Sequence, residues 1–167
     1  MASVLGLIDI RQTFLFHKEG EILNTELAQQ LKRLNTDYDV NFHLFSADSI
    51  HSFAENRYMG VPQFWENYGD IAGLNKEAIL GNGIFDISQP GFSSLQGNRF
   101  DKQDCESYRT VCARYQTALA DAFLLDDSDD NLVMASLSKV HPINVSMPDY
   151  LQQVQAFVST HASPRLK

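Results

Sequence analysis

The feature that most constrains the fold is a short apolar run near the start of the chain that ends in a carboxylate. Residues 4–8 read Val-Leu-Gly-Leu-Ile, and Asp9 follows them directly. A run this short, bounded by polar residues, is typical of a strand buried on both faces of a parallel sheet. Such sheets bind ligands just beyond the carboxyl ends of their strands. We therefore expect Asp9 at the ligand-binding edge.

The same pattern recurs in the last third of the chain, where the apolar residues 122–125 lead into Asp126 and Asp127. A single aspartate after a strand is most simply a turn former or a helix N-cap, but two in matching contexts favour a shared site. If the two strands are neighbours, their carboxylates converge and repel each other unless a proton or a hard cation lies between them. Mg²⁺ with oxygen ligands is the usual solution.

Composition and charge limit the class of protein. The chain has 167 residues, of which 44% are apolar and 20% charged, as expected for one soluble domain with its own core. The formal net charge of -8 argues against a general binder of nucleic acid or of anionic membranes, because neither polyanion would be attracted to it. A local cation must therefore meet any anionic substrate.

The cysteines and the N-terminal run bear on the compartment. Cys105 and Cys112 are seven residues apart on a predicted helix, too far for a disulfide, so we expect reduced thiols in an intracellular protein. The N-terminal run lacks a basic flank and is cut at Asp9, which argues against a signal peptide, and no run approaches transmembrane length. These features predict a cytoplasmic protein that does not span a membrane.

Strand-like and helix-like segments alternate along the chain. A hairpin with Gly20 at its turn is expected to overhang the edge where Asp9 emerges. Alternating strands and helices imply βαβ crossovers and a parallel sheet with helices on both faces, in one domain over residues 1–167. Its core should span about 4–158, followed by a short tail over 159–167. The strands are expected at 4–8, 40–44, 84–87, 122–125 and 141–145, and the helices at about 25–34, 50–54, 103–115, 132–137 and 150–158.

Several segments between these elements are read as local structure. Ser46 follows the strand at 40–44 and is expected to cap the next helix. Residues 81–83, Gly-Asn-Gly, predict a turn, and residues 88–99, rich in Ser, Gly, Gln and Asn, predict an irregular loop. The aromatic residues Phe64, Trp65 and Tyr68 are interpreted as local packing, with an exposed recognition surface as the alternative.

Four short motifs follow the predicted strand ends in order. Residues 9–13 read Asp-Ile-Arg-Gln-Thr, and Ser46 follows the next long strand. Lys102 opens a helix in a Lys-Gln-Asp-Cys-Glu-Ser-Tyr context, and residues 126–131 read Asp-Asp-Ser-Asp-Asp-Asn. This series resembles the motifs of the haloacid dehalogenase (HAD)-like superfamily of hydrolases: Asp-x-Asp-x-Thr, a Ser or Thr, a Lys, and Asp-Asp-x-x-x-Asn.

The resemblance implies a fold and a substrate class. The fold would be a three-layer Rossmann-like α/β architecture, HAD-like and without a large cap domain, because the residues between Thr13 and Ser46 are used by a hairpin, a helix and a strand. Residues 51–99 leave room for modest decoration only. The substrate would carry a phosphoryl group, and an open site often accompanies large substrates in this superfamily.

The resemblance also implies roles for the motif residues. Asp9 would attack phosphorus and form an aspartyl phosphate. Mg²⁺ would be held by the acidic residues and by the backbone carbonyl of Arg11. Lys102, Thr13 and Ser46 would bind the phosphoryl oxygens. The implied metal-site residues are Asp9, Arg11, Asp126 and Asp127, with Asp126 and Asn131 also expected to orient the groups behind the ligands.

One position departs from the family pattern. Family phosphatases use the second aspartate of the first motif as the general acid, and this chain has Arg11 there. A guanidinium cannot act as a base and releases a proton too reluctantly to be a good acid. Because such a group contributes typically 10² to 10⁴-fold, weak activity on alkyl phosphates is expected. The alternative to a Mg²⁺-dependent phosphohydrolase or phosphotransferase is an inactive member that acts by binding a partner.

Overall fold

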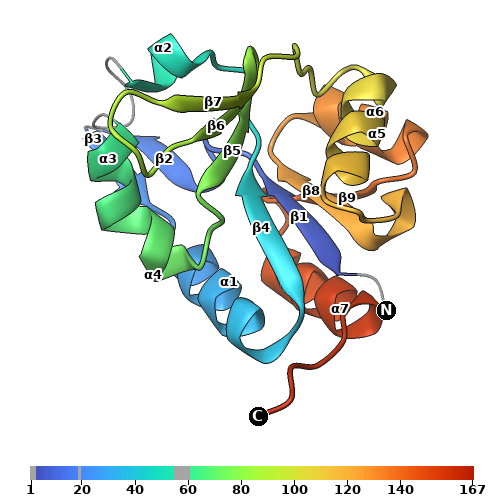
Figure 1. Cartoon of the computed structure of the whole chain (residues 1–167). Coiled ribbons are helices and arrows are strands. Elements are labelled where there is room, and N and C mark those ends of the chain that lie inside the picture. Colours follow the sequence, from blue (N-terminus) through green and yellow to red (C-terminus); the bar gives the residue numbers. More distant parts are fainter. Residues whose placement is uncertain (1–2, 19, 55–60) are drawn as a thin grey trace.

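The computed structural model describes residues 3–18, 20–54 and 61–167 and has a four-stranded parallel sheet at its centre (Figure 1). The strand order is β4-β1-β8-β9. Ile8 at the end of β1 aligns with Leu125 of β8, so Asp9 and Asp126 leave the same edge. The predicted neighbourhood of these two strands is confirmed. The strands are β1 Val4–Ile8, β4 Val40–Leu44, β8 Ala122–Asp126 and β9 His141–Asn144.

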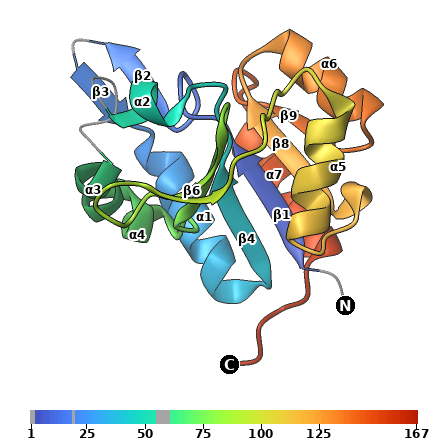
Figure 2. The ribbon, with the colours of Figure 1, turned by 45° about the horizontal axis from the view of Figure 1, so that its top comes forward.

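Helices cover both faces of this sheet, as predicted (Figure 2). Helices α1 (Thr25–Asp37) and α7 (Tyr150–His161) pack on one face. Helices α5 (Cys105–Arg114) and α6 (Asp129–Leu137) pack on the other. The sheet is therefore the middle layer of three, which is the predicted α/β architecture.

Strand β1 is buried on both faces, which accounts for its unbroken apolar sequence. Val4 and Ile8 contribute to the core under α1 and α7, whereas Leu5 and Leu7 contribute to the core under α5 and α6. Gly6 lies where the rings of two neighbouring strands meet. A Cβ on Gly6 would lie 2.5 Å from the Phe42 ring and 2.8 Å from the Phe123 ring, so the close packing of these rings requires glycine.

The predicted hairpin is present as β2 (Leu15–Lys18) and β3 (Gly20–Leu23), paired antiparallel. Glu19, in its turn, lies outside the described residues. A tight turn joins β1 to β2, with Gln12 at a φ of 55°, and Asn24 caps α1 by accepting from the Leu27 amide. Helices α1 and α7 each run three residues beyond their predicted ends, Leu34 and Val158.

The insertion between β4 and α5 is small, in agreement with the absence of a large cap. Its three strands form an antiparallel sheet, and a parallel bridge between Phe45 and Ile79 joins this sheet to the chain beyond β4. The inserted elements are α2 Ile50–Ser52, α3 Val61–Phe64, the π-helical turn η2 Trp65–Gly69, α4 Asp70–Ala72, β5 Glu77–Leu80, β6 Gly83–Asp86 and β7 Ser93–Gln96. Outside the insertion, a short helix, η3 (Leu119–Asp121), precedes β8.

Two local expectations are wrong. Ser46 does not cap a helix: its Oγ accepts from the Asp48 amide at 3.2 Å, and Ser49 caps α2 instead. Residues 88–99 are not wholly irregular, because β7 lies within them and pairs with β6. The β7 side chains are mostly exposed, so backbone hydrogen bonding holds this strand and no apolar alternation reveals it.

Other local expectations hold. Phe64 is buried, and Trp65 and Tyr68 pack against the core, which confirms the packing interpretation. Cys105 and Cys112 are both free thiols. Within the described parts of the chain, every helix is too short or too polar to cross a bilayer.

Candidate functional site

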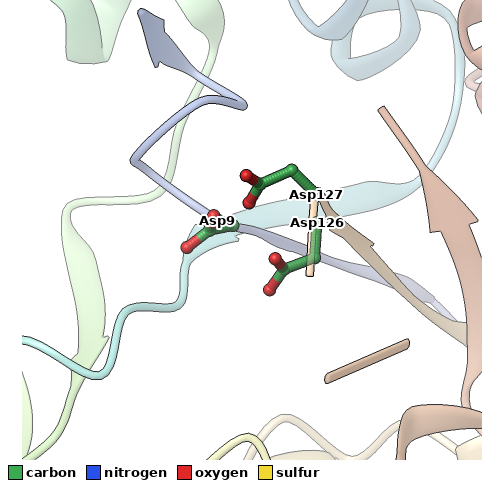
Figure 3. Close-up of side chains that lie close together, drawn as sticks. All are labelled: Asp9, Asp126 and Asp127. Carbon is green, nitrogen blue, oxygen red and sulfur yellow. The ribbon is translucent and has the colours of Figure 1, made fainter. Parts of the chain in front are cut away.

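Three carboxylates meet at the carboxyl edge of the parallel sheet. Asp9, Asp126 and Asp127 each offer one oxygen, and these atoms lie within 4.8 Å of one another (Figure 3). The Asp9 amide continues the ladder of β1 by donating to the Leu125 carbonyl at 3.0 Å. Asp9 and Asp126 are buried, whereas Asp127 is exposed. The convergence expected from the two apolar runs is therefore present.

Lys102 supplies the positive charge of this cluster. Its Nζ donates to Asp9 Oδ1 at 2.5 Å and to Asp126 Oδ2 at 2.9 Å, and the residue is only 3% exposed. Two neighbours position it: Tyr108 Oη donates to the Lys102 carbonyl at 2.7 Å, and the Phe45 ring centroid lies 5.6 Å from Nζ. The motif around Lys102 gives no sign of either contact, so sequence reasoning missed both.

Asp126 is anchored on both of its oxygens. Oδ1 accepts from the Ser128 amide at 2.9 Å, and Oδ2 accepts from Asn131 Nδ2 at 3.2 Å as well as from Lys102. Ser128 also caps α6 by accepting from the Asn131 amide. The start of α6 thus holds Asp126 against Lys102, while Asp127 extends into the open side of the cluster.

The two hydroxyl residues occupy different places. Thr13 is fully buried, and its Oγ1 donates to Asp9 Oδ2 at 3.4 Å. Ser46 lies beyond the end of β4, where its amide donates to the Ile79 carbonyl at 3.0 Å. Thr13 therefore touches the carboxylate predicted to be the nucleophile, and Ser46 stands at the neighbouring strand end.

Arg11 lies beside the cluster and is engaged with the loop after β4. Its Nε is 3.6 Å from Asp48 Oδ2, and its side chain is 39% exposed. The loop that carries Asp48 also carries Ser46, whose Oγ accepts from the Asp48 amide. The side chain at the general-acid position of the family pattern is thus a cation that links the first and second motifs.

The electrostatics of the cluster favour a bound cation. Burial raises the pKa of Asp9 to about 6, against the lowering effect of Lys102, and the charges of Asp126 and Asp127 raise it further. Burial and Asp126 also raise the pKa of Asp127. Three carboxylates face one ammonium group, so two negative charges are left without compensation when all are ionised. An all-oxygen donor set of this kind fits a hard divalent cation such as Mg²⁺.

The predicted site residues thus fall into two groups. A connected network of side-chain contacts joins Asp9, Thr13, Lys102, Asp126 and Asn131, with Asp127 added through its proximity to the other carboxylates. Arg11 and Ser46 border this network through the loop at residues 46–48.

Comparison with known proteins supports the fold. No protein-family model and no curated protein matches the chain. A hypothetical protein from Xanthomonas campestris is similar over 95% of this chain and 86% of its own, with 14% sequence identity and a TM-score of 0.51. A candidate 3-deoxy-D-manno-octulosonate 8-phosphate phosphatase from Vibrio cholerae aligns over 91% of this chain and 72% of its own, with 12% identity and a TM-score of 0.48. At the level of the fold, the predicted α/β architecture, a parallel sheet between two layers of helices, is confirmed.

Proposed function

We propose that this chain is a Mg²⁺-dependent phosphohydrolase or phosphotransferase of the HAD-like type, acting on a phosphorylated substrate with Asp9 as its nucleophile. The observation that carries the proposal is the placement of Asp9 next to both Lys102 and two further carboxylates at the carboxyl edge of the sheet. A nucleophile, a cation for the phosphoryl oxygens and an oxygen-rich metal site are thereby combined in one place.

The chemistry proposed for Asp9 has two steps. An oxygen of the Asp9 carboxylate attacks phosphorus while the bond between phosphorus and the leaving oxygen breaks, which yields an aspartyl phosphate. Water, or an acceptor hydroxyl in a phosphotransfer, then attacks that phosphorus and releases Asp9. Thr13 and Lys102 hold the two Asp9 oxygens, so the carboxylate is oriented before the substrate arrives, which reduces the entropic part of the barrier.

The anionic substrate must approach an anionic nucleophile, and this chain's charges are arranged for that. Lys102 places a positive charge next to Asp9, and Asp126 and Asn131 keep Lys102 in place. Mg²⁺ would be held by Asp9, Asp127 and the Arg11 carbonyl, and when bound it would neutralise the phosphoryl oxygens as a Lewis acid. Ser46 would donate to one of those oxygens from the neighbouring strand end.

Arg11 limits the range of leaving groups. With no general acid at this position, an alkoxide would have to depart without a proton, whereas a phenolate or a carboxylate leaves as an anion. The Arg11 guanidinium can stabilise such a developing anion by its charge. We therefore expect aryl and acyl phosphates to be better substrates than alkyl phosphates.

The test is a phosphatase screen with Mg²⁺ on the wild type and on Asp9→Asn. Turnover of aryl or acyl phosphates that is lost in Asp9→Asn, together with a stable beryllofluoride adduct on Asp9 of the wild type, is the expected result. Asp86→Asn serves as the matched control, because Asp86 is a buried aspartate of the inserted sheet, paired with Lys76. A folded wild type that forms no adduct and turns over none of these phosphates would refute the assignment of Asp9.

The second candidate function is a catalytically inactive HAD-like protein that acts by binding a partner. Arg11 favours it, because a cation stands at the general-acid position and is paired there with Asp48. The same screen distinguishes the two functions, since metal-dependent turnover that requires Asp9 excludes an inactive protein. The cytoplasmic location and the lack of a nucleic-acid partner stay predictions from composition.

A further inference from the structure

A concave pocket is formed by the chain segments next to Ser46 and Lys102. It has a volume of 470 Å³, which is within the range of pockets that hold small molecules. Three segments line it: the loop after β4, the turn between β5 and β6, and the stretch that leads into Lys102. The lining residues are Ala47, Ser49, Gly81, Asn82, Gly97, Arg99, Phe100 and Asp101.

The walls of this pocket continue directly from two residues of the candidate active site. Ala47 follows Ser46, and Asp101 precedes Lys102. Because adjacent Cα atoms are about 3.8 Å apart, the pocket begins within one residue of both groups. A phosphoryl group held at Asp9 would therefore leave the rest of its substrate within reach of the pocket.

Hydrogen bonds between the three segments make the pocket a built feature. The Gly81 amide donates to the Asp48 carbonyl at 2.9 Å, and the Phe100 amide donates to the Gly81 carbonyl at 3.3 Å. The side chain of Asn82 accepts from the Ile50 amide at 3.0 Å. A Cβ on Gly81 would lie 2.4 Å from the Ala47 carbonyl oxygen, so the turn packs directly against the loop after β4.

The two charged residues that line the pocket differ in their hydrogen bonding. Arg99 is exposed there and makes no hydrogen bond or ion pair with any residue in the described parts of the chain. Asp101, the other charged lining residue, uses Oδ1 to accept from the Gln103 amide at 2.9 Å. The guanidinium donors at the pocket wall are therefore not engaged by these parts of the chain, and a carboxylate or a phosphate is the group that matches them in geometry.

We propose that this pocket binds the leaving group of the phosphorylated substrate and selects, through Arg99, leaving groups that carry a second anionic group. This inference rests on the proposed function and deepens it by naming the substrate class. Phe100 and Ala47 supply the apolar part of the wall, and Arg99 supplies hydrogen-bond donors. The second anion can be a carboxylate or a further phosphate, because both accept a paired contact from arginine.

Binding without turnover tests the pocket directly. The probes are 4-carboxyphenyl phosphate and 1,4-phenylene bisphosphate, whose second group is an anion, and 4-carbamoylphenyl phosphate, whose second group is neutral. Their binding is measured by calorimetry with Mg²⁺ on the Asp9→Asn protein, and they are called the anionic and the neutral probes after that second group. At least one anionic probe should bind about 5-fold more tightly than the neutral one, as expected for one charge-assisted contact at a partly exposed site. The two anionic probes show whether a carboxylate or a phosphate is preferred, after allowance for the two equivalent ends of the bisphosphate.

Two variants then assign the preference to the pocket. Arg99→Gln should bring the ratio of anionic to neutral affinity close to one. Gly97→Leu should weaken all three probes, because a Cβ at Gly97 meets nothing within 4 Å and the larger side chain can occupy the pocket. The control is Leu95→Gln, whose side chain is 42% exposed on β7 and does not line the pocket; it should leave all three affinities unchanged.

The outcomes separate this inference from the proposed function. Absence of binding, no preference for an anion, or a preference that survives Arg99→Gln overturns the pocket assignment. Turnover of 4-nitrophenyl phosphate by the wild type reports on the phosphatase function independently. Turnover without the anion preference supports the phosphatase function and refutes the pocket assignment. The Arg99-dependent preference in a wild type that forms no beryllofluoride adduct and turns over no phosphate shows an anion-binding pocket and refutes the phosphatase function.

Discussion

Replacing the predicted nucleophile should stabilise the metal-free protein. Asp9 is buried beside two other carboxylates and shares one ammonium group with Asp126. Burial is the main reason that its pKa is raised to about 6. An ionised Asp9 therefore costs folding free energy that Asp9→Asn, a substitution of nearly equal size, does not cost.

The sign and size of this stability change follow from the linkage between protonation of Asp9 and folding. The pKa of Asp9 is raised from 3.8 to about 6, so its favourable contribution is complete below about pH 4 and is lost as pH rises through about 6. At about 1.4 kcal/mol per pH unit, the loss approaches about 3 kcal/mol at neutral pH. Because Asp9→Asn also removes a charged partner of Lys102, we expect a net gain of about 1 to 3 kcal/mol.

Urea unfolding in the presence of a chelator, at about pH 4 and about pH 7.5, measures this effect. Asp9→Asn should be more stable than the wild type at the higher pH, and the difference should shrink at the lower one. Mg²⁺ should then stabilise the wild type at the higher pH more than it stabilises Asp9→Asn.

Asp86→Asn is the control with the opposite sign. Burial acts to raise the pKa of Asp86, but hydrogen bonds from Ser88 and the ion pair with Lys76 outweigh it and hold that pKa below its ordinary value. Its contribution is present above the unfolded pKa and is lost as pH falls, so Asp86→Asn should destabilise most at neutral pH. An Asp9→Asn protein that is less stable than the wild type at both pH values would show that the Lys102 pair outweighs the cost of burial.

Three further predictions concern the metal, the leaving group and the core. Asp127→Ala should abolish Mg²⁺ binding more completely than Asp126→Ala, because the Asp126 oxygens are already engaged by the protein; equal losses by calorimetry would contradict this. Arg11→Asp should raise alkyl phosphate turnover by up to roughly 10²-fold and flatten the dependence on leaving-group pKa, and a metal-binding variant that gains nothing would favour the inactive alternative. Gly6→Ala should lower the free energy of unfolding by about 1 to 3 kcal/mol in urea, because its Cβ would overlap two core rings; an unchanged stability would show that those rings can move aside.

The position of the candidate site at the carboxyl edge of the sheet could be predicted from the sequence because its signals are local. An apolar run followed by a polar residue identifies a buried strand and its end, and parallel strands place their carboxyl ends together. Asp9, Asp126 and Asp127 were therefore predicted to meet, and they do. The helices on both faces follow from the same alternation of segments.

The immediate surroundings of that edge depended on contacts between distant parts of the chain. Strand β7 has exposed, polar side chains and exists because β6 offers it a hydrogen-bonding edge. Ser46 was expected to cap a helix, but its hydroxyl instead binds the Asp48 amide, and Asp48 pairs with Arg11.

The sheet edge was predictable and its side-chain surroundings were not, because different parts of the chain determine them. Burial of an apolar run is dictated by the residues of that run, so the sequence alone determined the sheet, its layers and the edge where the carboxylates emerge. A side chain's partners depend on which segments the folded chain brings together. Folding alone brings the Phe45 ring against Lys102 and brings Arg99 into the wall of a pocket shared with the loop after β4, because each of these arrangements joins segments that lie far apart in the sequence.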